Sequence, residues 1–188
     1  MKTLTTLILV LLAINVSGQS TKSSDLKNAL SNLEKENNLK NQSIYFELFP
    51  NTFNGFLEMF GFENGKVAPL YDGYDYVQVL FELDKISKKK QMKKWIEISI
   101  GGKWEADAVN YFQHNLQPRI LINVNLTYEL LSERTDKEIE SFFYFFFNEI
   151  HPQYEIVPTE LKKLQNKNKE FYKLLLTGHK RAIKDSGH

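Results

Sequence analysis

The sequence predicts an all-α protein, a compact bundle of seven to nine short helices. Apolar residues recur at intervals of three and four through most of the chain, as in helices that bury one face. Thr135 and Glu138 have the Thr-x-x-Glu spacing of a helix-opening capping box, and six consecutive aromatic residues, Phe142–Phe147, follow. We therefore expect a helix over 136–149 that is apolar on nearly every side and forms the hub of the core.

The first half of the chain predicts helices separated by polar, proline or glycine-containing breaks. Ser24 is placed to cap the first helix, and Pro50 disfavours helical geometry in the residue before it. Gly61 suits a left-handed helix end. The expected elements are a helix over 23–38, a polar break at 40–43, a helix over 53–60, a loop over 62–73, a helix over 74–86 and one or two helical turns around 92–96.

The second half continues the helical pattern, with no confident strand. The expected elements are a helix over 104–116, a short helix starting at Pro118, one over 128–132 capped by Asn125 or Thr127, the hub helix, and a long final helix opening at Pro158 and Thr159. Pairs of short helices leave a helical-repeat arrangement open, although no fixed period supports it.

The N-terminal segment has the three parts of a secretory signal peptide. Lys2 is positively charged, residues 4–14 are apolar, and Val16, Ser17 and Gly18 resemble a cleavage site. We expect cleavage after Gly18, which leaves a single all-α domain over 19–188. An uncleaved anchor is the alternative. No cysteine follows the apolar segment, so a lipoprotein signal is excluded.

The composition favours a bacterial periplasmic or secreted protein. Exported eukaryotic domains often use disulfides, and this chain has no cysteine. Two Asn-x-Ser/Thr sequons begin at Asn41 and Asn125, and we expect neither to carry a glycan. The 24 basic and 23 acidic residues nearly balance, which argues against a general nucleic-acid binder. No segment after the signal is apolar enough to span a membrane.

No catalytic or cofactor motif is present. The sequence lacks a P-loop, a dinucleotide fingerprint, a His-Glu-x-x-His pair and a nucleophile elbow. Four histidines without cysteine support a metal site poorly. We therefore expect no cofactor, no metal and no catalytic residue, and the absences argue against an enzyme.

One candidate ligand site lies on the predicted helix over 104–116. Its members, an indole, a carboxylate, a phenol and an imidazole, are spaced three, four and three residues apart, which places them on one stripe: Trp104, Asp107, Tyr111 and His114. Such a stripe can bind a polar ligand or perform acid–base chemistry. Gly101 and Gly102 precede it and leave backbone donors for an anion. The simpler alternative is that the acids favour the helix N-terminus and Trp104 packs in the core.

A second candidate is a partner-binding loop around Gly73. Tyrosine offers contact area and a polar tip at low entropic cost. The expected contact residues are Tyr71, Asp72, Tyr74, Asp75 and Tyr76. The expected partner is another envelope or secreted protein, and the chain itself is expected to be monomeric.

Two further charged features have a functional and a simpler interpretation. Glu149 and His151 suggest a carboxylate–imidazole pair after the hub helix, although residues two apart do not share a helical face. Six lysines suggest contact with phosphates or an acidic partner, or else an ordinary solvated helix face. They are Lys85, Lys88, Lys89, Lys90, Lys93 and Lys94.

Three segments carry a resemblance to a family of uncharacterised small exported bacterial proteins. They are APLYDGYDY (68–76), GKWEADAVNYFQ (102–113) and TDKEIESFFYFFF (135–147), within a region of roughly 45–152. The resemblance implies no activity and no catalytic residue. By analogy, small proteins of this sort often accompany secreted toxins as immunity proteins.

Together these features predict an exported, non-catalytic protein-binding domain of the immunity or inhibitor type. The alternatives are a small-ligand protein or enzyme that uses the Trp/Asp/Tyr/His stripe, and a structural envelope domain.

Overall fold

The computed structural model describes residues 22–186 apart from residues 64, 72, 106 and 151–152, so the predicted signal peptide lies outside the described residues. Residues 22–35 are helical. The labelled helices that follow are α2 (Leu39–Leu48), α3 (Phe53–Phe60), α4 (Tyr74–Glu82), α5 (Lys88–Ser99), α6 (Asp107–Ile122), α7 (Val124–Leu131), α8 (Asp136–Phe147), α9 (Thr159–Lys162), α10 (Leu164–Lys167) and α11 (Lys169–Ser186). The prediction of an all-α fold is confirmed, with a helix count close to the predicted seven to nine.

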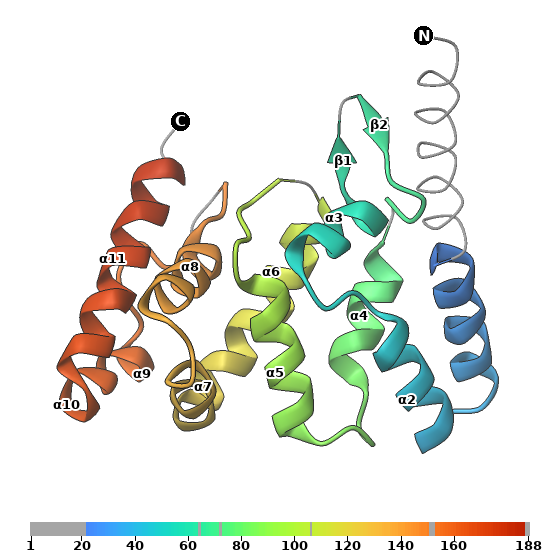
Figure 1. Cartoon of the computed structure of the whole chain (residues 1–188), viewed down its shortest axis with the longest axis horizontal. Helices are drawn as coiled ribbons and strands as arrows, with labels where there is room; N and C mark the ends of the chain where they lie inside the picture. The colour runs from blue at the N-terminus through green and yellow to red at the C-terminus, as the bar shows by residue number, and fades with distance from the viewer. Residues whose placement is uncertain (1–21, 64, 72, 106, 151–152, 187–188) are drawn as a thin grey trace, which may run out of the picture.

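The chain progresses along the longest axis of the molecule, from residues 22–35 at one end to α10 and α11 at the other (Figure 1). The connections collect on two opposite sides. One side, called the hairpin side below, holds the two short strands, the loop between α5 and α6, and the end of α8 (Figure 1). The turns between α4 and α5 and between α7 and α8 lie on the opposite side. Loops distant in sequence therefore share one edge.

Helix α8 is the predicted hub. The Thr135 side chain accepts from the Glu138 backbone N–H, and the Glu138 carboxylate accepts from the Thr135 N–H, so the capping box is confirmed. All five phenylalanines in the aromatic run are buried, whereas Tyr144 is half-buried. The buried apolar side chains form one cluster that extends from Leu26 to Ala182.

A glycine brings α11 against α8. A Cβ atom at Gly178 would lie 2.6 Å from the carbonyl oxygen of Glu140, closer than any side chain permits. The ring of Phe171 on α11 meets Phe143 edge-on, with centroids 5.8 Å apart. The hub is thus covered closely along this face.

The segment 62–73, predicted as a loop, contains a small hairpin. Strand β1 (Phe62–Glu63) pairs antiparallel with β2 (Lys66–Val67), and Gly65 has a φ of 75°. Asn-Gly is a preferred two-residue hairpin sequence because glycine adopts positive φ without strain. Asn64 and Gly65 were therefore a local signal that the sequence interpretation missed.

Several predicted boundaries are wrong in the first half of the chain. The expected break at 40–43 lies within α2, because the Asn38 side chain caps that helix by accepting from the Asn41 N–H at 2.8 Å. Gly61 ends α3 as expected but with φ −85° and ψ −176°, an extended conformation rather than a left-handed one.

Several predicted helix boundaries are also wrong in the second half of the chain. Helix α6 begins at Asp107 instead of Trp104 and continues through Pro118. Helix α7 starts after Asn123, which makes no side-chain cap. The long final helix is divided into α9, α10 and α11.

Candidate functional site

The loop between α5 and α6 is tied along α8. The Gly101 N–H donates to Ser141 Oγ at 2.8 Å, and the Trp104 N–H donates to Asn148 Oδ1 at 2.8 Å. A Cβ atom at Gly102 would lie 2.5 Å from the Phe145 ring, so only glycine lets the backbone pass there. The Gly102 N–H is also bonded, to Ser99 O. The expected free glycine donors for an anion are therefore already used within the protein.

Two glutamines on α6 close the C-terminal end of α8. Gln113 Nε2 donates to the carbonyl oxygens of Phe145 and Asn148 at 2.7 and 2.9 Å, and Gln117 Nε2 donates to Phe146 O at 2.8 Å. The last carbonyls of a helix have no partner within it, so these buried amides replace the missing donors. Neither glutamine was among the predicted site residues, although the two lie four residues apart on the buried face of α6.

Glu149 lies next to this helix end with its side chain removed from solvent. Its residue surface is 4% exposed, and its carboxylate accepts from Gln117 Nε2 at 2.9 Å and from the Gln153 N–H at 3.2 Å. Burial raises the pKa of Glu149, and these two hydrogen bonds and the nearby His114 oppose that rise. Among the residues that the structure describes, no cationic group forms an ion pair with it.

A pocket of about 180 Å³ opens at this position and is called the α8 pocket. Inside it, the Tyr144 hydroxyl donates to Asp185 Oδ2 at 3.1 Å. The guanidinium of Arg181 lies 3.9 Å from the centre of the Tyr144 ring and bonds to Glu140 at 2.9 Å. The lining residues are Lys103, Trp104, Tyr144, Asn148, Glu149, Ile150 and Asp185.

A second hollow, called the hairpin pocket, shares Lys103 with the α8 pocket. Its volume is about 460 Å³, and it is lined by Asn54, Leu57, Glu58, Phe62, Lys103 and Glu105. Because Lys103 lines both hollows, the two pockets are adjacent on the hairpin side.

The predicted partner-binding tyrosines border this region. The Tyr71 ring lies 6.2 Å from the Phe62 ring, and the Tyr74 ring meets Tyr111 edge-on at 5.1 Å. Tyr76 is half-buried against Phe60. Asp75 is exposed in the first turn of α4, and Asp72 lies outside the described residues. The tyrosines are thus divided between surface positions and packing.

The predicted Trp/Asp/Tyr/His stripe is distributed over different surroundings. Trp104 precedes α6 and lines the α8 pocket, whereas Tyr111 packs on Tyr74. Asp107 is exposed at the start of α6. His114 is exposed, and its Nδ1 lies 2.7 Å from Gln153 Nε2, which connects it to the surroundings of Glu149. His151, expected as the partner of Glu149, lies outside the described residues.

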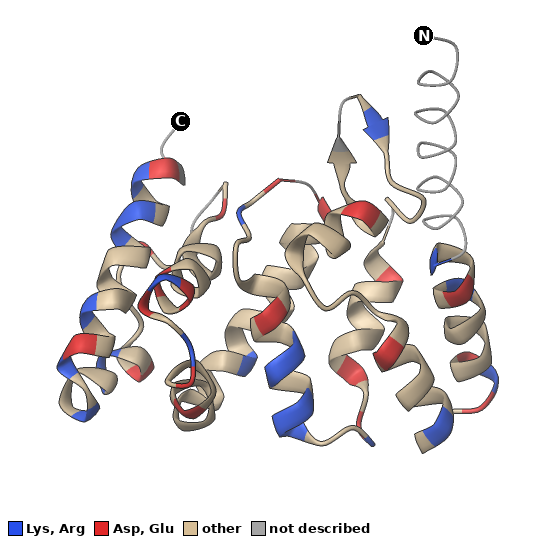
Figure 2. Ribbon diagram, viewed as in Figure 1, with Lys and Arg blue, Asp and Glu red and all other residues tan. Residues whose placement is uncertain are grey.

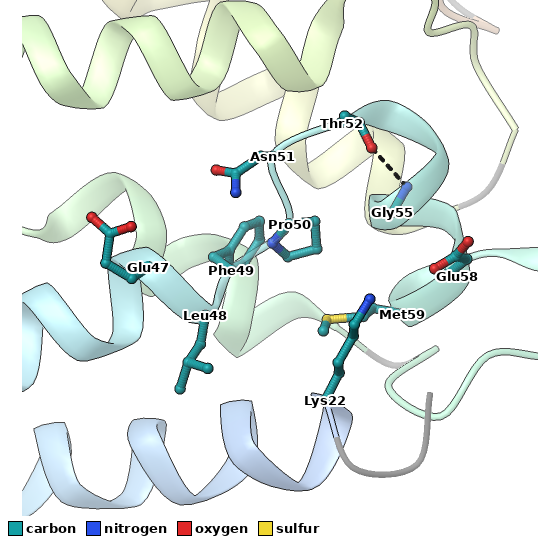
Figure 3. Close-up of a pocket in the computed structure, with 10 residues that line it drawn as sticks. All are labelled: Lys22, Glu47, Leu48, Phe49, Pro50, Asn51, Thr52, Gly55, Glu58 and Met59. Carbon is teal, nitrogen blue, oxygen red and sulfur yellow. Dashed lines mark hydrogen bonds between the residues drawn. The ribbon is translucent and has the colours of Figure 1, made fainter. Parts of the chain in front are cut away.

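A third pocket, of about 340 Å³, lies between residues 22–35, α2 and α3 (Figure 3). Glu47, Leu48, Phe49 and Pro50 contribute from the end of α2, and Lys22 faces Met59 across it (Figure 3). The Thr52 side chain there caps α3 by accepting from the Gly55 N–H at 3.1 Å.

Lys94 lies beside the C-terminal end of α2 instead of on a solvated helix face. It is 5% exposed, and its ammonium donates to Phe46 O and, at 2.8 Å, to Phe49 O. Pro50 has no N–H to offer the carbonyl of Phe46, so Lys94 supplies the missing donor. Figure 2 shows other lysines of the cluster toward the opposite side of the molecule, where Lys89 pairs with Glu129.

Comparison with protein-family models, with curated proteins and with solved structures finds no match to this chain. The described residues contain no cluster of three or more His, Cys, Asp or Glu side chains able to hold a metal ion. Within the same residues, no helix is both long enough and apolar enough to cross a membrane.

Proposed function

We propose that this chain is an exported bacterial protein that binds another envelope or secreted protein through its hairpin side, without catalysis. The analogy with small proteins that accompany secreted toxins suggests an immunity or inhibitor role for such a domain. The export part of the proposal rests on residues 1–18 of the sequence.

The observation that supports a binding face is the exposure of apolar side chains around the hairpin. Phe62 is 47% exposed, Val67 62% and Tyr74 50%. Exposed aromatic residues near a hollow are typical of protein interfaces, in which they anchor the contact and neighbouring polar groups surround it. The hairpin pocket lies directly beside Phe62 and offers such a hollow.

A protein partner explains this face better than a small ligand does. The apolar residues occupy the hairpin and the start of α4, so they are spread over a surface instead of converging in one deep cavity. Small-ligand sites bury most of the ligand in a concave pocket. A protein surface can contact both the hairpin and the α5–α6 loop at once.

The test is capture of a partner by the tagged mature chain from an envelope extract of the producing organism. We expect one protein to be recovered near one-to-one. The double variant Phe62→Ser, Tyr74→Ser should lower the capture at least tenfold while leaving the helical circular dichroism unchanged.

Ile122→Ser is the matched control, because Ile122 is 78% exposed and ends α6 away from the hairpin. It should capture as well as the wild type. Equal capture by the double variant, or no stoichiometric partner at several salt concentrations, would remove the proposed function.

A further inference from the structure

We propose that the α8 pocket receives the protonated amine or guanidinium of a lysine or arginine side chain of the protein partner. This inference rests on the proposed function for the source of the cation, and on the pocket itself for its chemistry.

Two carboxylates supply the negative charge. Glu149 is almost fully buried and Asp185 is exposed, and both line the pocket. A carboxylate has about four acceptor sites, and the Glu149 carboxylate accepts from two neutral N–H groups, so acceptor capacity remains. A buried carboxylate without a cationic partner is costly, and a cation brought next to it relieves that cost.

The helix end adds to this field. The pocket begins at Asn148, directly after α8, where the aligned peptide dipoles leave a partial negative charge. Gln113 and Gln117 satisfy the terminal carbonyls with neutral amides, which provide hydrogen bonds but no positive charge. The site therefore favours a cation even though its backbone groups are paired.

Aromatic rings complete the lining. Trp104 and Tyr144 contribute an indole and a phenol, and both ring types attract cations through their π systems. Tyr144 already holds the guanidinium of Arg181 in this way within the protein.

The cationic side chains of the described residues form no ion pair with the buried carboxylate of Glu149. Lys103 is exposed on the loop shared with the hairpin pocket, and Arg181 is paired with Glu140. His114 lowers the pKa of Glu149 but is exposed, and its ring lies against Gln153.

The size of the pocket indicates a side chain. A volume of about 180 Å³ holds a head group and a few methylenes. Pockets for whole drug-sized ligands span about 300–1,000 Å³. Since the pocket adjoins the proposed binding face through Lys103, a partner seated on the hairpin can reach it with one long basic side chain.

The direct test uses side-chain analogues and needs no partner. Titration of the mature chain at pH 7.5 with n-butylguanidinium or n-butylammonium, followed by amide NMR, should give saturable shifts at Trp104 and Asn148–Ile150. The neutral isostere n-butylurea should give none. Glu149→Gln should weaken butylguanidinium at least tenfold, and Asp185→Asn should weaken it less.

Glu58→Gln, in the hairpin pocket, is the matched control and should leave cation binding unchanged. Equal shifts with butylurea, or undiminished binding by the Glu149→Gln variant, would overturn the inference. Circular dichroism equal to that of the wild type shows that the Glu149→Gln variant is folded, so a loss of binding reports on the carboxylate.

Capture experiments separate the two proposals. If butylguanidinium binds but no partner is captured, the cation pocket stands and the proposed function fails, together with the partner as the cation source. If a partner is captured equally by the wild type and by the Glu149→Gln, Asp185→Asn double variant, the proposed function stands and a partner-supplied cation is ruled out.

Discussion

The C-terminal ends of α2 and α8 both lie beside a pocket, and the protein closes them with different chemistry. At the end of α2, the buried ammonium of Lys94 bonds to two carbonyl oxygens. At the end of α8, the neutral amides of Gln113 and Gln117 take the same part. Both ends carry the partial negative charge of a helix C-terminus, but among the described residues only the end of α2 receives a hydrogen bond from a cationic side chain.

This difference indicates which of the two helix ends can accommodate a cation from another molecule. The pocket at the end of α2 already has Lys94 next to it, so its field is compensated. Lys103 lines the α8 pocket but is exposed, and among the described residues no cation forms an ion pair with the buried Glu149, which adds negative charge. The two pockets therefore differ in their electrostatic surroundings as well as in volume, which is about 340 Å³ at the end of α2 and about 180 Å³ at the end of α8.

The largest expected effect on stability comes from removing the buried Phe145 ring near the end of α8. Phe145 is 1% exposed, and its ring packs against Phe53 and Phe112. Phe145→Ala should lower the free energy of unfolding by about 3–5 kcal/mol, because a cavity remains after the ring is lost. Urea unfolding measures this, with the half-exposed Leu176→Ala as the control. A loss under about 1 kcal/mol would contradict the hub assignment.

Removing the charged cap of α2 comes next. Lys94→Met keeps the length of the side chain but leaves Phe46 O and Phe49 O without their donor. We expect the free energy of unfolding to fall by about 2 kcal/mol, because two buried carbonyl oxygens lose their donor. The removal of a desolvated charge offsets part of this loss. Lys93→Met, at an exposed neighbour, should change stability by less than about 0.5 kcal/mol. Equal effects of the two variants would show that Lys94 is an ordinary surface lysine.

Removing the neutral cap of α8 should destabilise the protein less than removing Lys94. Gln113→Leu removes the donor to Phe145 O and Asn148 O, at an expected cost of about 1 kcal/mol. The loss is partly offset because the substitution also removes the buried Gln113 Oε1, which has no hydrogen-bond partner among the described residues. Gln165→Leu on the exposed face of α10 is the control. If Gln113→Leu proved more destabilising than Lys94→Met, the ranking of the two caps would be reversed.

What the sequence predicted well was local. The hub helix follows from a capping box and an aromatic run within thirteen residues, 135–147, and the burial of its second half follows from the phenylalanines that occupy nearly every position there. The hairpin was equally local, yet the Asn64-Gly65 signal was overlooked because residues 62–73 offered no long alternating pattern.

The functional groupings depended on distant contacts and were less predictable. Trp104 was assigned to a helical stripe, but bonds from Gly101 to Ser141 and from Trp104 to Asn148 hold this segment as a loop along α8. Both interpretations of the lysine cluster place Lys94 on the surface, whereas its ammonium is buried against the carbonyl oxygens at the end of α2. No spacing along the chain reveals which carbonyls a side chain will meet across the core.

The most direct test of the comparison is that the two helix ends give stability a pH dependence of opposite sign. Burial lowers the pKa of Lys94 to about 8 from 10.5, so between these values the unfolded chain binds more protons and the free energy of unfolding rises with pH. Burial raises the pKa of Glu149 above 4.5, so from 4.5 up to that raised value the folded chain holds more protons and the free energy of unfolding falls with increasing pH.

Difference curves isolate these contributions from those of the tyrosines and surface acids. The stability of the wild type minus that of Lys94→Met should rise from pH 8 to 10, while the wild type minus Glu149→Gln should fall as the pH increases above 4.5. Urea unfolding at closely spaced pH values measures both. A flat Glu149 curve would mean that its carboxylate is as well compensated in the fold as in water, and the α8 end would then lack the unmet charge that distinguishes it from the α2 end.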